Sequence, residues 1–187
     1  MKKRIILFIL SNLLIFPGLL LAESIKIEGC LNYYSISDSI YKDIYGSGNI
    51  MFGGSVSYEV INKLELRAEI NYYQDKGEMT LTKEEITFTI IPIVFGMRYQ
   101  LIKNKNFNPY FGGGLSYYTY KEDLPPRFED VSDSTLGYHI EGGGYFNLVK
   151  GVYIDLNIRY IIADAKSEEE TIKLGGFRAG MGIGYNF

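Results

Sequence analysis

The 187-residue sequence has few of the residues on which metal, redox and nucleic-acid sites depend. It has no tryptophan, one histidine and one cysteine, so an internal disulfide is excluded and ligands for a transition metal are scarce. Acidic residues number 22 against 19 basic ones, and no basic stripe is present, which excludes a nucleic-acid surface. After residue 22 no segment has helical periodicity or the apolar run of about 20 residues that a transmembrane helix needs.

The first 22 residues form a separate segment. A basic start at residues 2–4 precedes an apolar run over 5–16, then Pro17, Gly18 and a small residue, Ala22. This order predicts a secretory signal peptide over 1–22, cleaved after Ala22, and one domain over 23–187. The alternative is an uncleaved membrane anchor, but polar residues and Pro17 interrupt the run.

Residues 23–187 carry net negative charge and one thiol. The first 22 residues hold three basic and no acidic residues, so the rest holds 16 Lys and Arg against 22 Asp and Glu. Cys30 could be a lipoprotein modification site, but charged Glu23, Lys26 and Glu28 separate it from the apolar run. We interpret Cys30 as a small strand residue.

Alternation with period two is the main pattern of the chain. From Phe177 to Phe187 every odd position is apolar or aromatic, and every even position is small or polar. Such a period predicts a β-strand with one apolar face. The apolar phase reverses near Ile90, which we interpret as a bulge between Ile90 and Pro92. The same alternation predicts strands over about 24–35, 48–60, 64–73, 86–101, 108–120, 135–148, 152–162 and 177–187.

The connections between these eight strands alternate between long and short. The long ones, 36–47, 74–85, 121–134 and 164–171, hold fifteen acidic and six basic residues, whereas the three short turns hold four Lys and no acid. An even strand number with short turns at one end and longer loops at the other is typical of an outer-membrane barrel. We therefore predict an all-β, eight-stranded antiparallel up-and-down transmembrane β-barrel, with short turns and both termini in the periplasm.

The direction of the apolar face separates this barrel from a soluble lipocalin-like barrel, which would bind a ligand inside. Facing the polar side outward would send Arg67 and Arg98 into lipid, at about 2–4 kcal/mol for each Arg near the midplane. Glycines on the polar face leave room for large side chains in a narrow lumen. The apolar-face aromatics also form two levels, as expected at two membrane interfaces: Tyr33, Tyr72, Tyr117, Tyr138 and Tyr160, then Tyr58, Tyr99, Phe111, Phe146, Tyr185 and Phe187.

The polar faces place charges of both signs in the lumen. Since eight strands leave an interior that side chains can just fill, we favour a salt-bridged plug over an open pore. A gate, in which an Arg changes its carboxylate partner, is the alternative. The predicted network consists of Glu28, Glu65, Arg67, Glu69, Arg98, Glu141, Asp155, Arg159 and Arg178, with Lys26 and Glu59 on the same faces.

Three other patterns suggest chemistry without supporting it. His139 and Glu141 on the lumen face suggest a hydrolase, but no serine lies two positions from His139 and the pair points inward. The glycine runs 112–114 and 142–144 are not followed by the Lys-Ser/Thr of a phosphate loop. The acidic run 168–170 could bind divalent cations, although a solvated loop is the simpler interpretation. We expect no catalytic, cofactor or metal site.

Three stretches resemble the small eight-stranded bacterial outer-membrane β-barrel domain family, the porin-like outer-membrane proteins. They are IPIVFGMRYQL at 91–101, NPYFGGGLSYY at 108–118 and GMGIGYNF at 180–187. The resemblance implies an outer-membrane location among lipid and lipopolysaccharide, and a terminal signal, Tyr185 and Phe187, for the barrel-assembly machinery. Two roles stay open: a structural barrel whose outer loops contact surface ligands, or a narrow or gated transport barrel.

Overall fold

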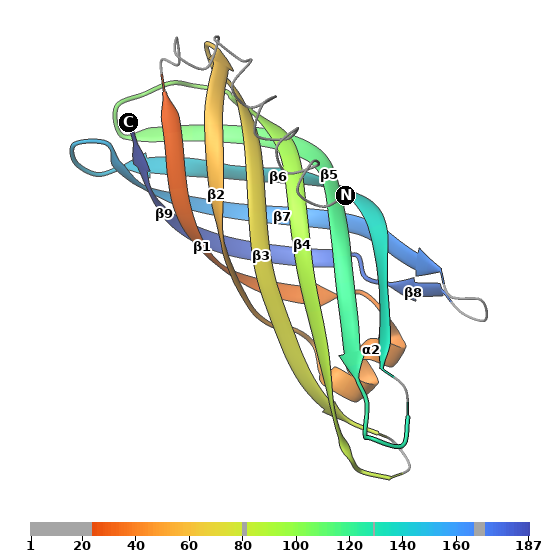
Figure 1. The fold of residues 1–187 in the computed structure, drawn as a ribbon. Helices are drawn as coiled ribbons and strands as arrows, with labels where there is room; N and C mark the ends of the chain where they lie inside the picture. The colour runs from red at the N-terminus through yellow and green to blue at the C-terminus, as the bar shows by residue number, and fades with distance from the viewer. Residues whose placement is uncertain (1–23, 80–81, 129, 167–170) are drawn as a thin grey trace, which may run out of the picture.

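The chain folds into a barrel whose wall is formed by eight antiparallel strands (Figure 1). A computed structural model describes residues 24–79, 82–128, 130–166 and 171–187. The predicted signal peptide and the acidic run 168–170 lie outside these residues. The elements are β1 (Ile25–Ile36), α2 (Ser39–Tyr45), β2 (Asn49–Ile61), β3 (Leu64–Glu78), β4 (Glu85–Gln100), β5 (Phe107–Asp123), β6 (Val131–Asn147), β7 (Val152–Lys166), β8 (Thr171–Lys173) and β9 (Gly176–Asn186).

Hydrogen bonding closes the sheet on itself. Each strand from β1 to β7 pairs with the next, β7 pairs with β9, and β9 returns to β1, from Lys26↔Asn186 to Ile36↔Gly176. The short β8 pairs with β7 alone and is not part of the wall. Closure leaves no strand edge within the wall, as a membrane interior requires. The prediction of an eight-stranded antiparallel barrel is confirmed.

The two ends of the barrel differ, and we name them by their connections. The turn end carries the short connections 62–63, 101–106 and 148–151 and the C-terminal residue Phe187 (Figure 1). Backbone at Lys150 and Gly151 has positive φ, 46° and 85°, which allows the tight reversal there. The loop end carries α2 and the β3–β4, β5–β6 and β7–β8 hairpins.

Side chains alternate between the two faces of the wall in the predicted sense. Leu156 and Ile183 are 45% and 62% exposed on the outside, whereas Arg98 and Arg159 are 0% and 2% exposed in the lumen. The exposed aromatics include Tyr33, Tyr117, Tyr138 and Tyr160 of one predicted level and Tyr99, Phe111, Phe146, Tyr185 and Phe187 of the other. The apolar outer surface is therefore the one that faces lipid.

The bulge predicted between Ile90 and Pro92 is wrong. β4 pairs with β5 without a register shift from Thr87↔Asp123 to Gln100↔Tyr110, and its even residues point inward throughout. Ile86, Phe88 and Ile90 are apolar and nevertheless buried in the lumen, because the interior is apolar near the loop end. The irregularity lies instead in β2, between Glu59 and Ile61.

The loop end contains more regular structure than predicted. β3, β5, β6 and β7 extend beyond the predicted strands, so most of 74–85 and 121–134 belongs to long hairpins. The predicted loop 36–47 contains α2, which begins after Asp38 and ends before Gly46. The Asp38 carboxylate accepts the N–H groups of Ile40 and Tyr41 at 2.9 and 3.1 Å, which caps the first turn. Among the described residues, no helix has the length and hydropathy needed to cross a membrane.

An aromatic and aliphatic core fills the loop-end half of the lumen. Tyr41 and Tyr45 of α2 project into it, stack at 4.7 Å between centroids and contact Phe88 of β4. The other buried members are Tyr34, Ile36, Met51, Tyr73, Ile86, Ile90, Tyr118, Tyr120, Ile161, Ala163, Ala165 and Leu174. The lumen therefore has an apolar half near the loop end and a polar half toward the turn end.

Candidate functional site: the ion-pair network of the lumen

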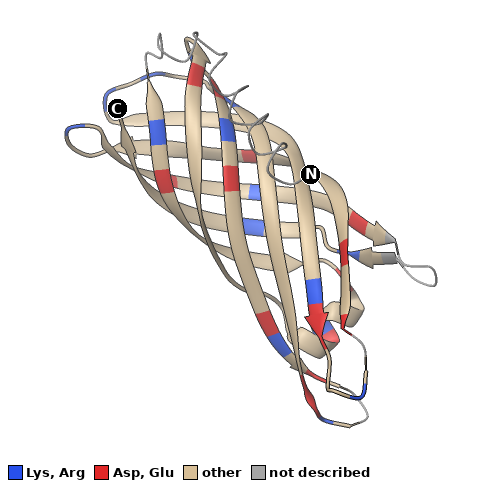
Figure 2. Cartoon of the chain, viewed as in Figure 1, with Lys and Arg blue, Asp and Glu red and all other residues tan. Residues whose placement is uncertain are grey.

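The nine residues of the predicted network are brought together in the middle of the barrel. They project from β1, β3, β4, β6, β7 and β9, and each is 7% exposed or less. Figure 2 shows this band of charged residues across the strands, separate from the charges at the loop end. Together with Lys26, four arginines face five carboxylates, so the network is electrically balanced.

Glu69 of β3 is the centre of one half of the network. It accepts Arg67 Nε at 3.1 Å, Arg159 Nη2 at 3.1 Å and Arg178 Nη1 at 2.5 Å. Arg67 reaches across to Glu28 of β1, with Nη2 2.8 Å from Oε1. Three guanidinium groups around one carboxylate form charge-assisted hydrogen bonds, which are the strong kind in a medium of low dielectric constant.

Arg98 of β4 is the centre of the other half. Its Nε lies 2.8 Å from Glu141 Oε1 and its Nη1 lies 2.9 Å from Asp155 Oδ2. Glu141 also accepts Arg159 Nη2 at 2.8 Å, so Arg159 links the two halves. The ring of Tyr110 lies 4.3 Å below the Arg98 guanidinium, and its hydroxyl donates to Asp155 at 2.7 Å. The charge of the Arg98 guanidinium is therefore balanced by carboxylates inside the lumen.

A polar vestibule of about 490 Å³ opens at the turn end of the network. Lys26 pairs with Glu65 on its inner side, and Tyr145 donates to Glu65 Oε2 at 2.8 Å. Lys103 Nζ pairs with Glu59 at 2.6 Å on the solvent side. Carboxamide side chains complete the lining: Gln100, Asn104, Asn108, Asn147 and Asn186. Lys26 and Tyr145 also line this vestibule.

At the opposite side of the network, α2 covers the apolar core. The Tyr41 hydroxyl lies 3.3 Å from Asp75, and the Tyr45 hydroxyl donates to Glu122 of β5. Lys173 N–H donates to Asp38 Oδ2 at 3.1 Å, which ties the helix cap to β8. Partial burial would raise the pKa of Asp38, but the backbone N–H groups of Lys173, Tyr41 and Ile40 lower it below its ordinary value.

Glycines on the inner face of β9 make room for the network. A Cβ atom on Gly182 would lie 2.3 Å from Glu28 Oε1, and one on Gly184 would lie 2.4 Å from the Tyr153 hydroxyl. Tyr153 in turn donates to Glu28 Oε2 at 3.1 Å. In the last strand, the apolar residues therefore form the outer surface that faces lipid, and the glycines that alternate with them leave space for large side chains in the lumen.

Gly182→Ala is expected to lower the free energy of unfolding by about 1–3 kcal/mol, because the methyl group displaces Glu28 from Arg67. Urea unfolding of the refolded barrel measures this. Gly29→Ala on the neighbouring strand is the matched control, since nothing lies within 4 Å of its Cβ position. Both changes restrict the unfolded chain equally. Equal stability of the two variants would contradict the role assigned to Gly182.

His139 does not form a catalytic arrangement that a substrate can reach. Its Nδ1 lies 3.3 Å from the Ser116 hydroxyl, a neighbour that the sequence did not reveal, because Ser116 comes from β5. His139 and Ser116 are 3% and 1% exposed, inside the lumen. Among the described residues no group of three or more His, Cys, Asp or Glu side chains is arranged to hold a metal ion.

Cys30 lies inside the lumen, whereas Tyr185 and Phe187 lie on the outer surface of the barrel. Cys30 is a buried strand residue whose thiol lies 3.1 Å from Glu28 Oε1. Tyr185 and Phe187 are exposed at the turn end, with ring centroids 4.8 Å apart. Their part in recognition by the assembly machinery stays a prediction.

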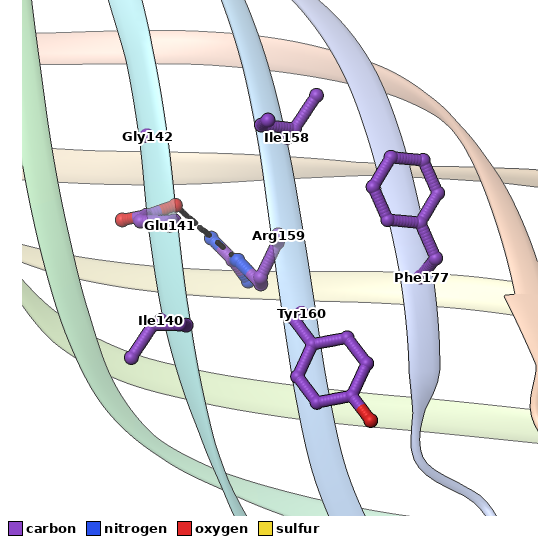
Figure 3. A pocket seen from close by; sticks show the side chains of 7 residues that line it. All are labelled: Ile140, Glu141, Gly142, Ile158, Arg159, Tyr160 and Phe177. Atoms are coloured by element: carbon purple, nitrogen blue, oxygen red, sulfur yellow. Dashed lines mark hydrogen bonds and ion pairs between the residues drawn. The ribbon is translucent and has the colours of Figure 1, made fainter.

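The network lies directly behind the lipid-facing surface. A depression of about 290 Å³ lies on β6, β7 and β9, and Glu141 and Arg159, which pair with each other across β6 and β7, are among its residues (Figure 3). Its other residues are Ile140, Gly142, Ile158, Tyr160 and Phe177. The barrel wall is thus one strand layer thick between the ion pairs and lipid.

Tyrosines are the members of the site that sequence reasoning missed. Tyr110, Tyr145 and Tyr153 form a buried cluster that supplies hydroxyl donors to the carboxylates. Tyr145 and Tyr153 have the inward phase of their strands, which was the available signal. Tyr41 and Tyr45 lack such a signal, since their segment was predicted as a loop. The whole assembly fills the lumen with paired charges and offers no exposed nucleophile among the described lumen residues.

Comparison with known proteins agrees with this architecture. The family model described as outer membrane protein beta-barrel domain matches residues 22–187. A search of curated proteins gives no match. Among solved structures, the chain is similar to the outer membrane protein OprG from Pseudomonas aeruginosa, with a TM-score of 0.72 and 16% identity over 89% of this chain and 96% of that chain.

Two further solved structures have the same fold. Neisserial surface protein A is 17% identical, with a TM-score of 0.60 over 88% of this chain and 96% of that one. Ail, the attachment invasion locus protein of Yersinia pestis, in complex with the heparin analogue sucrose octasulfate, is 17% identical, with a TM-score of 0.51 over 88% and 97%. At these identities the likeness concerns the fold.

Proposed function

The chain belongs to the outer membrane protein β-barrel domain family and is thus a bacterial outer-membrane barrel. We propose that it is a closed, non-enzymatic barrel that serves as a membrane anchor for its loop end. In this role the barrel anchors the loop-end hairpins and α2 in the membrane, where they contact surface ligands. The loop end faces outside and the turn end, with both termini, faces the periplasm. Fold alone does not assign a function, so the proposal depends on the lumen.

The filled lumen is the observation that carries this proposal. Arg98 and Asp155 are 0% exposed, and Arg159 links Glu69 to Glu141. The tyrosine core and α2 cover the network on the loop side. A hydrated ion would have to break several ion pairs and displace Tyr41 and Tyr45 to pass, which supports a plug over a pore.

We therefore expect the barrel to show little or no steady conductance in planar bilayers. Arg67→Ala and Arg98→Ala, combined with Tyr41→Ala and Tyr45→Ala, should give small channels, because these changes shorten side chains that fill both halves of the lumen. Single-channel current recording across a planar bilayer measures both. Lys76→Ala, at an exposed pair with Glu85, is the control and should stay closed. Large, steady channels from the unchanged barrel would overturn the plug and favour a transport barrel.

A further inference from the structure

The polar vestibule at the turn end has the size of a small-molecule site. Its volume of about 490 Å³ lies within the range of such sites, about 300–1,000 Å³. Its lining comes from β1, β2, β4, β5, β6, β9 and the turn 101–106, at the end of the barrel that carries Phe187 (Figure 1). The proposed anchoring of the loop end does not require this pocket, because the pocket lies at the opposite end of the lumen.

Three carboxamides of the vestibule are held at one end by the protein. Gln100 Nε2 donates to a buried carboxylate of the network, and Asn108 Oδ1 accepts the backbone N–H of Asn104 at 2.5 Å. Asn147 Nδ2 donates to the carbonyl oxygens of Asn104 and Lys105, at 3.4 and 3.0 Å. These contacts fix which end of each carboxamide is the oxygen and which is the nitrogen.

The other end of each of these carboxamides has no protein partner among the described residues. Gln100 is 1% exposed, yet its Oε1 accepts no hydrogen bond there. Asn108 Nδ2 and Asn147 Oδ1 are likewise without a partner in the described part of the chain. The vestibule therefore presents two acceptors and one donor at fixed positions. Because buried polar atoms are normally hydrogen-bonded, we expect Gln100 Oε1 to accept a hydrogen bond from a molecule in the vestibule.

The charges of the vestibule are already balanced within the protein. Its two lysines, Lys26 and Lys103, pair with Glu65 and Glu59. Glu59 also accepts the Lys63 N–H at 3.2 Å. An anion or a cation would have to break one of these pairs to gain a partner, whereas a neutral ligand leaves both in place.

The backbone of the turn end is also hydrogen-bonded. The N–H groups that donate to backbone carbonyls there include those of Gln100, Leu101, Asn147, Leu148 and Asn186. An extended peptide would find no free ladder among these groups, so a ligand must be recognised by side chains. Hydroxyl groups suit this recognition, since one hydroxyl can donate to a carboxamide oxygen and accept from a carboxamide nitrogen.

We propose that the vestibule binds a neutral saccharide. Its hydroxyl groups donate to Gln100 Oε1 and Asn147 Oδ1 and accept from Asn108 Nδ2, while both lysine–glutamate pairs stay intact. This inference goes beyond the proposed function, which concerns the loop end. It does not depend on which side of the membrane the turn end faces.

The test uses the refolded, isotope-labelled barrel in dodecylphosphocholine micelles, because a maltoside detergent would itself present a saccharide. Maltose is the probe, and NMR follows the side-chain amide signals of Gln100 and Asn108. We expect these signals to shift and to saturate as maltose is added. Permethylated maltose keeps the sugar rings but has no hydroxyl donor, and it should give no saturable shift.

Asn108→Asp replaces the unpartnered donor by an acceptor and keeps the oxygen that accepts the Asn104 N–H. It should weaken maltose binding by about tenfold, the equivalent of one net hydrogen bond. Asn106→Asp is the matched control, because it adds the same charge two residues away, at a position that does not line the vestibule. This control should bind maltose like the unchanged barrel.

The outcomes separate a saccharide site from a vestibule that holds only water, an ion or a peptide. No saturable shift with maltose, equal weakening by the two Asp variants, or equal binding of permethylated maltose would each overturn the proposal. Tighter binding of putrescine, acetate or trialanine than of maltose would overturn it as well. The permethylated control uses the unchanged protein, so it decides the question even where Asn108→Asp does not fold. Channel recording, and not this titration, decides whether the barrel is closed.

Discussion

Arg98→Ala is expected to lower the free energy of unfolding by about 3–5 kcal/mol, the largest loss from any single side chain of the network. Arg98 is 0% exposed and bonds Glu141 and Asp155, so its removal leaves two buried carboxylates short of a partner. The loss measures those unpaired charges more than the favourable energy of the ion pairs themselves. Urea titration of the folded barrel in micelles, followed by tyrosine fluorescence, gives the value.

Two controls separate charge pairing from simple shortening of the side chain. Lys76→Ala removes an exposed pair with Glu85, both side chains being more than 60% exposed, and should cost no more than about 1 kcal/mol. Arg98→Ala combined with Glu141→Gln and Asp155→Asn should recover part of the stability, since the unpaired charges are then removed. If the free energy of unfolding of the triple variant is no higher than that of Arg98→Ala, packing and not charge dominates the stability of this site.

Leu156→Arg is expected to destabilise the membrane-inserted barrel by about 2–4 kcal/mol, because an arginine on the lipid face near the midplane is poorly solvated. Leu156 lies in the middle of β7, points outward and is 45% exposed. Refolding into lipid vesicles at several urea concentrations measures the difference from the unchanged protein.

Ile162→Arg on the same strand and face is the matched control for Leu156→Arg. Ile162 pairs with Tyr138 of the loop-end aromatic level, where the cost of arginine should fall to about 0–1 kcal/mol. A similar loss at both positions would argue against depth in a bilayer as the cause. A polypeptide that stays folded and dissolved in water without detergent would contradict the lipid-facing assignment altogether.

The outward phase of the wall strands, apart from the first half of β4, was predictable because it depends on local alternation. In β9, Met181 and Ile183 alternate with Gly180 and Gly182, and only one face of such a strand can meet lipid. The same alternation placed Arg67, Arg98 and Arg159 in the lumen. Which carboxylate each arginine meets was not predictable, because Glu69 and Arg159 are 90 residues apart and approach only across the closed barrel.

The bulge predicted in β4 shows where local reasoning fails. The reversal of the apolar phase at Ile90 is a change in what the lumen contains, and not a change in backbone register. α2 was missed for a related reason. A seven-residue helix is too short to show periodicity, and it is held by the Asp38 cap and by Tyr41 and Tyr45 packed against Phe88.

The sequence by itself determined the architecture of this protein: eight alternating strands, an apolar outer face and a charged lumen, because period two and membrane solvation act on each strand separately. Only the tertiary structure decided how the lumen is filled and where α2 lies. Those features depend on contacts between strands that are distant in the chain, which no local pattern encodes.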